Sequence, residues 1–229
     1  MFNDHNVQPV LHLITDGRDT PPNSSVGCLA DLQAVLKKTP AVIATLMGRY
    51  YAMDRDKHYE RNKIAYDAMV NGIGRAVETP EEAIQGSHQD RVTDEFIKPA
   101  VISPEHTIQS GDVLLFYNFR ADRMRQIVHA FTDETFDHFE RAELSDLTVI
   151  TFTQYADDLP AAVLFPPNNV KHPLARVLSE NGLKQFHAAE TEKYAHVTYF
   201  FNGGAEEPFA GEERMLVSSP RVATYDLQP

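Results

Sequence analysis

The sequence predicts an α/β protein built around a mostly parallel β-sheet. Over about the first 130 residues, short apolar runs alternate with segments whose apolar residues recur at helical spacing. A shorter set of such segments follows the proline-containing stretch Phe165–Asn169, which has the composition of a linker or domain edge. We therefore expect two α/β units, residues 1–167 and residues 168–229.

Four apolar runs in the first unit have the length of buried strands. Each is a short continuous run bounded by polar or turn-forming residues, as expected for strands covered on both faces. The four predicted strands are Val10–Thr15, Ala41–Met47, Asp112–Tyr117 and Leu147–Phe152.

Helices are predicted between these strands. Thr39-Pro40 ends the first helix, and Asn71-Gly72 ends the second near Val70. Pro80–Gln89 forms a third, and the fourth carries apolar residues at positions i, i+3, i+4 and i+7. The apolar faces of the first, second and fourth helices consist, respectively, of Val26, Leu29, Leu32 and Leu36; of Ile64, Ala65, Ala68 and Met69; and of Met124, Ile127, Val128 and Phe131.

The second unit repeats the pattern on a smaller scale. Its predicted order is a helix over residues 173–180, a strand Lys184–Ala189, a helix over residues 193–201 and a strand Arg214–Ser218. About 60 residues is small for a free-standing open sheet, because so short a chain buries little of its surface. We expect this unit to be part of a larger domain.

Composition restricts the classes of function. The 229 residues carry 33 acidic and 21 basic side chains, for a net charge of −12, which argues against a nucleic-acid partner but not against a small anion in a local basic pocket. Cys28 is the single cysteine, so neither an intrachain disulfide nor a cysteine-based zinc site is expected. No apolar run approaches the roughly 18 residues of a membrane span. A soluble protein of the cytoplasm, without a membrane partner, is the expectation.

Arginines follow three of the predicted strands. In open α/β sheets, ligands bind in the loops beyond the carboxyl ends of the strands. A guanidinium group offers a planar fork of donors that matches carboxylate or phosphate oxygens. The pattern therefore predicts a site for a small anion at one edge of a single sheet. The motifs are Asp16-Gly17-Arg18-Asp19, then Gly48-Arg49 with Asp54-Arg55-Asp56, and Asn118-Phe119-Arg120-Ala121-Asp122-Arg123.

A structural interpretation competes with this one. Any single Arg-Asp pair at the end of a strand is more often a salt bridge than a binding site, and the interleaved Asp19, Asp54 and Asp122 are suited to orienting the arginines. Three such motifs at one edge favour a shared site, because independent surface pairs need not converge. The pattern by itself indicates an anion site and does not indicate a reaction.

The chain contains five ordered motifs that together run nearly end to end: DGRDTPP (Asp16–Pro22), GRYYAMDRDKHYER (Gly48–Arg61), NFRADRMRQ (Asn118–Gln126), AETEKYAHVTYFFNGG (Ala189–Gly204) and SPRVATYDLQP (Ser219–Pro229). These motifs resemble those of the cofactor-independent (2,3-bisphosphoglycerate-independent) phosphoglycerate mutases. The resemblance implies an isomerase that interconverts 3-phosphoglycerate and 2-phosphoglycerate in glycolysis and gluconeogenesis without a bisphosphoglycerate requirement.

The resemblance also implies a domain organisation. Residues 1–167 would form the inserted substrate-binding domain, a three-layer sandwich with a mostly parallel sheet. Residues 168–229 would be a partial re-entry of the chain into an alkaline-phosphatase-like domain. In the family that domain carries two Mn²⁺ ions and the serine that becomes phosphorylated.

Roles of individual residues follow from the same motifs. Arg18 and Asp19 match the pair that holds the glycerate carboxylate and hydroxyl, and Lys193 matches the lysine that reaches the phosphoryl group from the phosphatase-like domain. The remaining matches are the arginines that hold the carboxylate and phosphate: Arg49, Arg55, Arg120 and Arg123.

The chain also departs from the family pattern. It has no match to the nucleophile-serine segment or to the Asp- and His-rich metal motifs, so we expect no catalytic residue and no metal ligand in it. An internal fragment, inactive alone, is the leading interpretation, with phosphoglycerate and the rest of the phosphatase-like domain as partners and a monomeric state. The alternatives are a stand-alone phosphate-ligand binding or regulatory module, and an inert remnant.

Overall fold

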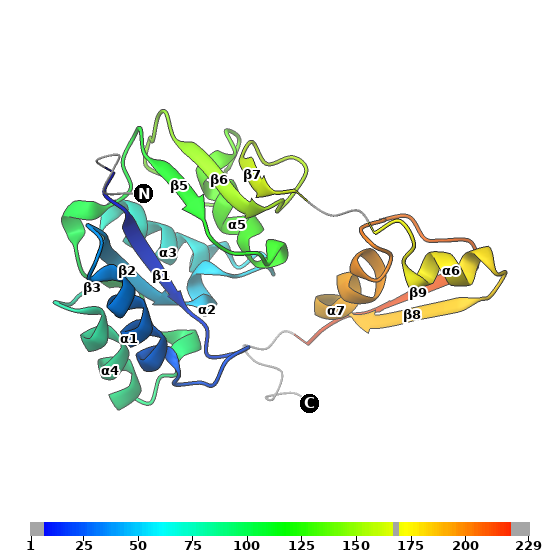
Figure 1. Ribbon diagram of the computed structural model, residues 1–229, viewed down its shortest axis with the longest axis horizontal. Helices are drawn as coiled ribbons and strands as arrows, with labels where there is room; N and C mark the ends of the chain where they lie inside the picture. The colour runs from blue at the N-terminus through cyan, green and yellow to red at the C-terminus, as the bar shows by residue number, and fades with distance from the viewer. Residues whose placement is uncertain (1–6, 167–169, 221–229) are drawn as a thin grey trace. The chain divides into compact units, whose positions relative to one another are not determined.

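The computed structural model describes residues 7–166 and 170–220 of the chain (Figure 1). Its contacts divide the chain into two compact units, residues 1–166 and residues 167–229. The boundary falls inside the predicted linker Phe165–Asn169, of which residues 167–169 lie outside the described ranges. Most of the motif Ser219–Pro229 also lies outside them.

The strands of the first unit form two sheets in the described part of the chain. One has the order β1-β2-β4-β3 and the other the order β5-β6-β7. Every strand pair is parallel except β2 with β4. An α/β fold with mostly parallel sheets is therefore confirmed. The strands are β1 (Val10–Thr15), β2 (Val42–Gly48), β3 (Arg75–Ala76), β4 (Ala100–Val101), β5 (Val113–Phe116), β6 (Thr148–Thr153) and β7 (Ala162–Phe165).

The prediction that the three arginine-bearing strands share one sheet is wrong. β1 and β2 pair with each other, whereas β5 pairs with β6 in the other sheet. Apolar runs identify strands but not their hydrogen-bonded neighbours, which are fixed by contacts distant in the sequence. Strands β3 and β4 were not predicted, because each is only two residues long and is defined by its pairing with distant residues.

Five α-helices accompany these sheets in the described residues of the first unit. None of the described helices is long and apolar enough to cross a membrane. Short 3₁₀ turns also occur, of which η2 (Asp94–Phe96) matters for the site. The helices are α1 (Ser25–Leu36), α2 (Arg49–Ala52), α3 (Tyr59–Asn71), α4 (Pro80–Gln89) and α5 (Ala121–Thr132).

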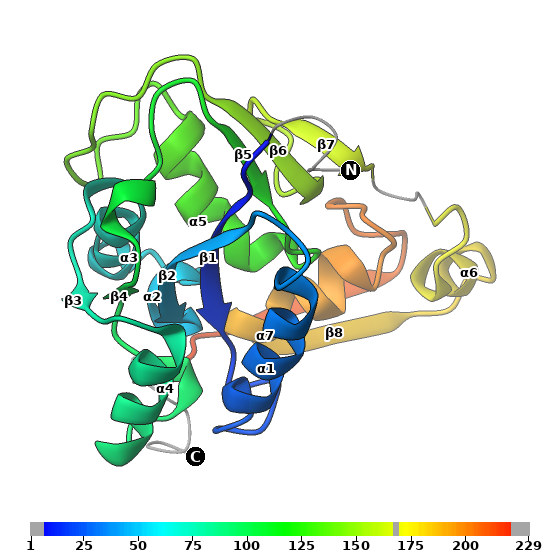
Figure 2. The ribbon, with the colours of Figure 1, turned by 60° about the vertical axis from the view of Figure 1, so that its left-hand side comes forward.

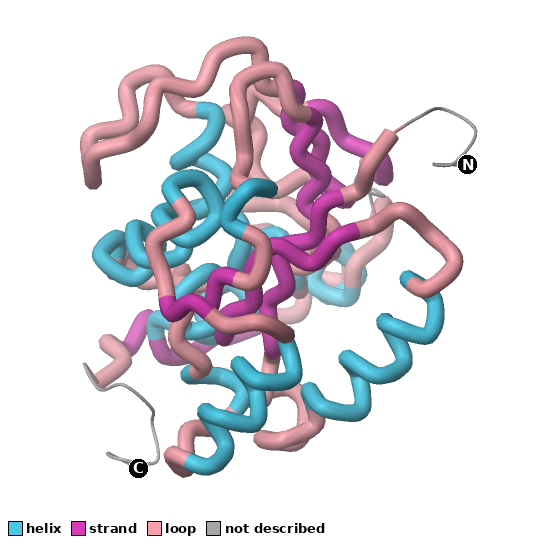
Figure 3. Tube along the Cα trace, turned by 90° about the vertical axis from the view of Figure 1, so that its left-hand side faces the viewer, coloured by secondary structure: helices cyan, strands magenta, loops and turns pink. Residues whose placement is uncertain are grey.

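Neighbouring side chains of β2 point into two different cores, because successive residues of a strand face opposite sides of a sheet. Leu46 packs in a cluster with Leu29 of α1 and Ile84 of α4. Met47 packs in a second cluster, with Tyr66 of α3 and residues of α5. Helices α1 and α4 thus cover one face of the sheet, and α3 and α5 cover the other (Figures 2 and 3). The first unit has three layers.

The second unit is a small α/β piece. Its two strands pair in parallel, with Gln185 opposite Glu212 and Glu190 opposite Val217. The helix predicted over residues 193–201 exists, but it begins two residues earlier as α7 and continues as a π-helical turn, η4. The elements are α6 (Leu174–Glu180), β8 (Gln185–Glu190), α7 (Thr191–Ala195), η4 (His196–Phe200) and β9 (Glu212–Val217).

Gly48, the last residue of β2, allows η2 to approach this strand closely. A Cβ atom on Gly48 would lie 2.2 Å from the carbonyl oxygen of Glu95, whereas real Cβ contacts are longer than 3.0 Å. The Gly48 amide donates to the carbonyl of Ile97 at 2.8 Å. Since φ of Gly48 is −74°, this close approach, and not backbone conformation, requires glycine.

We expect Gly48→Ala to lower the free energy of unfolding by about 1–3 kcal/mol or more, since an added methyl group in a packed site forces neighbouring atoms to shift. Gly27→Ala is the control, because a Cβ there in α1 meets nothing within 4 Å. That change should raise stability by up to about 1 kcal/mol through helix propensity. Urea denaturation measures both; equal effects of the two substitutions would contradict the packing argument.

Candidate anion-binding site

Arg49 anchors the loop that follows β1. It is the first residue of α2, directly after β2, and only 3% of its side chain is exposed. Its Nη1 atom donates to Asp16 Oδ1 at 2.8 Å and to Asp19 Oδ2 at 2.7 Å. Asp16 Oδ1 also accepts from the backbone amides of Arg18 and Asp19. One carboxylate therefore shapes the turn and ties it to the neighbouring strand.

Asp19 connects this loop to the start of α5. Its Oδ2 atom also accepts from Arg120 Nη1 at 2.9 Å. Arg120 donates through Nε to Asp122 Oδ1 at 3.1 Å, and Asp122 pairs in turn with Arg55. Acidic and basic side chains thus alternate from Asp16 through Arg49, Asp19, Arg120 and Asp122 to Arg55. The three loops converge although their strands belong to two sheets.

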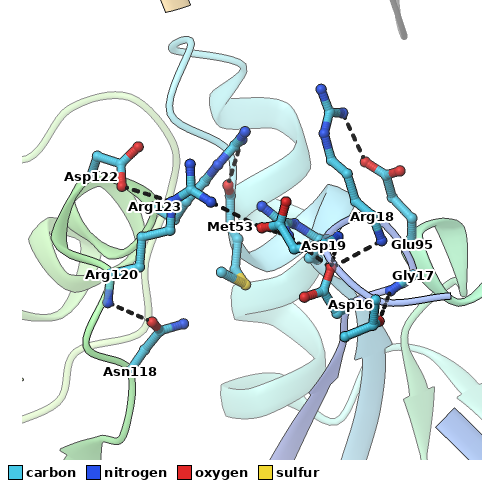
Figure 4. Close-up of polar contacts among 12 residues, drawn as sticks. Asp16, Gly17, Arg18, Asp19, Met53, Glu95, Asn118, Arg120, Asp122 and Arg123 are labelled. Carbon is cyan, nitrogen blue, oxygen red and sulfur yellow. Dashed lines mark hydrogen bonds and ion pairs between the residues drawn. The ribbon is translucent and has the colours of Figure 1, made fainter. Parts of the chain in front are cut away.

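Two further arginines lie beside this series (Figure 4). Arg18 Nη1 pairs with Glu95 Oε1 of η2 at 3.1 Å. Arg123 Nη1 donates to the carbonyl of Met53 at 3.3 Å. The residues predicted in the first unit, Arg18, Asp19, Arg49, Arg55, Arg120 and Arg123, are therefore all joined to this group of loops or next to it. Lys193 lies exposed on α7 of the second unit.

The ion pairs keep the carboxylates of the site charged. The hydrogen bond from Arg49 lowers the pKa of Asp19, and the charges of Arg49 and Arg120 add to this effect against the opposing effect of burial. Burial acts to raise the pKa of Asp122, but the hydrogen bond from Arg55 and the charge of Arg120 lower it overall. Burial acts to lower the pKa of Arg49, but hydrogen bonds to Asp19 and Asp16 raise it overall. Charged forms prevail at neutral pH.

The site contains a hydrogen-bond donor that has no partner in the described residues. It contains five arginines and four carboxylates that lie beside them. The Nη2 atom of Arg49 is buried and has no hydrogen-bond partner within the described ranges. A buried donor without a partner costs about 1–3 kcal/mol, and an oxyanion would satisfy it. The carboxylates are Asp16, Asp19, Asp122 and Glu95, and the arginines are Arg18, Arg49, Arg55, Arg120 and Arg123.

Asp54 holds the loop that carries Arg55. Its side chain is 3% exposed, and Oδ1 accepts from the amides of Asp56 and His58 and from Gln126 Nε2. Oδ2 accepts from Arg61 Nη1 at 3.1 Å. Of the residues that the motifs suggested as orienting the site arginines, Asp19 and Asp122 contact them directly. Asp54 instead accepts hydrogen bonds from its own loop, from Arg61 and from Gln126 of α5.

Sequence reasoning missed Glu95, Arg61 and Gln126. Glu95 follows no predicted strand, and its contact with Arg18 spans 77 residues of sequence, so no local pattern could reveal it. Arg61 is the last residue of the motif that begins at Gly48, and its guanidinium lies 4.0 Å above the Tyr50 ring. Gln126 is a buried amide beside the apolar positions of α5, and a polar residue next to a helix's apolar face is a usable signal.

A comparison with protein-family models decides the family. The model described as BPG-independent PGAM N-terminus (iPGM_N) matches residues 1–157, more than half of the chain. The chain belongs to this family. The resemblance inferred from the five motifs is thereby confirmed.

Known relatives are similar over almost the whole chain. Proteins named 2,3-bisphosphoglycerate-independent phosphoglycerate mutase from Thermomicrobium roseum and Moorella thermoacetica are 54% and 50% identical, over 96% of this chain and 43% and 44% of their own lengths. A crystal structure of Leishmania mexicana phosphoglycerate mutase, at low cobalt concentration, matches with a TM-score of 0.83 and 32% identity, over 99% of this chain and 45% of that one. The chain spans less than half the length of these relatives.

We expect Asp54→Asn to lower the free energy of unfolding by about 2–4 kcal/mol at neutral pH, because it weakens a buried, multiply hydrogen-bonded carboxylate. Burial acts to raise the pKa of Asp54, but hydrogen bonds from His58, Gln126 and Asp56 lower it overall. Its stabilisation is therefore present above the unfolded-state pKa of about 3.9 and is lost as pH falls through the lower folded-state pKa.

Urea denaturation over a pH series tests this. The stability difference between the parent and Asp54→Asn should shrink as the pH falls below about 4. Asp137→Asn is the control, because the Asp137 side chain is 89% exposed and lies 3.7 Å from His138. A difference that stays constant down to the lowest pH would show that the charge of Asp54 is not what stabilises the loop.

Proposed function

We propose that this chain is the substrate-holding part of a phosphoglycerate mutase that interconverts 3-phosphoglycerate and 2-phosphoglycerate. The supporting observation is the convergence of five arginines on loops from two sheets, with a buried guanidinium donor left over. Family membership and the names of the relatives agree with it. Because the relatives are more than twice as long, we assign the activity to the longer protein and propose that these 229 residues alone are inactive.

The chemistry of the substrate matches the donors and acceptors of the site. A phosphoglycerate carries a carboxylate, a free hydroxyl and a phosphate. Arg18, Arg49, Arg55, Arg120 and Arg123 supply charge-assisted hydrogen bonds for the two anionic groups. Asp19, held by Arg49 and Arg120, is the acceptor we propose for the hydroxyl. Fixing these groups orients the oxygen that gives up or receives the phosphoryl group.

The phosphoryl group itself would pass through a serine outside this chain. In the proposed organisation, residues 1–167 are the inserted substrate-binding domain, and residues 168–229 are part of an alkaline-phosphatase-like domain that brings Lys193 towards the phosphoryl group. Phe186 and Leu216 of the second unit are 61% and 53% exposed, which fits a unit that packs against more of its own domain. We propose a monomer acting in the cytoplasm.

Metal chemistry would also come from the rest of the protein. Residues 7–166 and 170–220 contain no group of three His, Cys, Asp or Glu side chains that could hold a metal ion. These residues therefore do not fit the two Mn²⁺ ions that we propose for the whole enzyme, and no step described for them uses a metal. We propose no bisphosphoglycerate requirement, in agreement with the names of the relatives.

Isothermal titration with 3-phosphoglycerate should detect weak binding to this chain, since part of the full site is missing. Arg18→Ala and Arg123→Ala should each weaken binding about 10- to 150-fold, because a lost charge-assisted contact costs about 1.5–3 kcal/mol. Lysine at either position should restore the affinity only in part, since an ammonium group lacks the planar fork.

The control is Arg176→Ala, which removes an exposed arginine of the second unit paired with Glu180 at 2.7 Å. It should bind like the parent. Thermal melts of each variant separate lost binding from lost folding. Salt bridges without a binding role would instead give lower melting temperatures and unchanged affinity, and equal affinity in all variants would refute the site.

A purified preparation of the 229 residues should show no mutase turnover at any manganese concentration, because covalent transfer needs an activated nucleophile and charge-stabilising ions that we place outside the chain. A coupled assay of 2-phosphoglycerate formation measures this. Turnover would contradict the assignment of catalysis to the rest of the protein. The assay can be repeated after adding the part of a relative that these 229 residues do not match. Binding without turnover in that mixture would favour a regulatory module.

A further inference from the structure

We infer that Glu95 is a positioning residue for Arg18, and that η2 is the support that fixes Glu95 in place. The inference rests on the proposed function, since it deepens the account of the same anion site. Arg18 Nη1 lies 3.1 Å from Glu95 Oε1, and the two side chains are 32% and 11% exposed. The glutamate is thus the more buried partner, and the arginine extends from it towards solvent.

The backbone at Glu95 is wedged between the two site loops. A Cβ atom on Gly17 would lie 2.6 Å from the Glu95 amide nitrogen, and one on Gly48 would lie 2.2 Å from the Glu95 carbonyl oxygen. Gly17 directly precedes Arg18, and Gly48 directly precedes Arg49. The Glu95 backbone is therefore in close contact with both arginine-bearing loops, and it leaves no space for a side chain at either glycine.

Asp94, the neighbour of Glu95, locks this segment to the rest of the unit. Its side chain is 1% exposed, and its carboxylate accepts from the amide and hydroxyl of Ser25 and contacts His88 Nε2 at 2.8 Å. Its carbonyl accepts from Thr15 Oγ1 at 2.7 Å, and its amide donates to the carbonyl of Pro22. These bonds tie η2 to β1, α1 and α4, so the backbone that carries Glu95 is held in place.

Glu95 acts on an anion in two opposing ways. Its negative charge repels the ligand. Its hydrogen bond holds Arg18, a long flexible side chain, in one orientation and leaves the other guanidinium donors available, which lowers the entropy lost when the ligand binds. The rigid support from Asp94 and the glycines indicates that the ordering effect outweighs the repulsion. The sign of the effect of removing Glu95 distinguishes the two.

The test measures 3-phosphoglycerate affinity for the parent chain, Glu95→Ala, Glu95→Gln, Arg18→Ala and the double variant Arg18→Ala with Glu95→Ala. We expect Glu95→Ala to bind about 3- to 10-fold more weakly, the cost of ordering one such side chain. Glu95→Gln should recover most of this loss, because its amide oxygen still accepts from Arg18. In the Arg18→Ala background, removing Glu95 should not weaken binding further.

Glu180→Ala is the matched control, since it also removes the carboxylate partner of an arginine, Arg176, but in the second unit. Tighter binding by Glu95→Ala would show that the residue only repels the ligand and would overturn the inference. An equal loss of affinity with and without Arg18 would overturn it too, because the effect would then come from the fold in general.

A second measurement does not depend on the ligand. The ¹⁵N relaxation of Arg18 Nε should show a lower order parameter in Glu95→Ala than in the parent, and no change in Glu180→Ala. If the parent failed to bind 3-phosphoglycerate, the proposed function would fail, while a lower order parameter would still support the positioning role. An unchanged order parameter in Glu95→Ala would overturn the inference even if the parent binds well.

Discussion

The arrangement of the site depends on one carboxylate, that of Asp19. Its Oδ2 atom accepts from Arg49 at the end of β2 and from Arg120 at the start of α5. No strand ladder joins the two sheets of the first unit in the described residues. The shared core, in which Met47 of β2 and Val149 of β6 belong to one cluster, also connects the two sheets. Arg55 with Asp122, and Arg123 with the Met53 carbonyl, connect the loop after β2 to α5. The contacts of Asp19 add the loop after β1 to this connection. We expected the loops to meet because their strands end at one edge of a single sheet; the contacts of Asp19 join loops from two sheets instead.

Interleaved aspartates also solve a problem of charge. Several guanidinium groups in one place repel one another unless negative charge lies between them. Asp19 lies between Arg49 and Arg120, and Asp122 lies between Arg120 and Arg55. The carboxylates make the arrangement stable before any ligand arrives. They also use donors that a ligand would otherwise take, so binding must rely on the remaining donors or on exchange of partners.

Local patterns predicted the parts of the fold that are local. The bounds of β1 and α4 agree with the sequence prediction residue for residue, because an apolar run and a Thr-Pro start define them. Helix α2 was not predicted, since its four residues lie in a polar motif. The division into two sheets and the Arg18–Glu95 contact were also not predictable, because both depend on residues that meet only after the chain has folded. The arginine motifs correctly predicted that the three loops converge, but the expected reason, a single shared sheet, was wrong.

A purely structural salt-bridge network and a binding site differ in what they leave unsatisfied. In a network that serves stability most buried donors are paired, because each unpaired donor lowers the free energy of unfolding. Arg49 is the most deeply placed arginine of the series: two aspartates hold its Nη1, and its Nη2 is buried without a partner in the described chain. The two ion pairs through Nη1 fix the plane of the guanidinium group and therefore also the position of Nη2. A rigid, charged group with one unpaired donor suits the recognition of an oxyanion, which is the role that we propose for Arg49, and the ion pairs with Asp16 and Asp19 hold this donor in place.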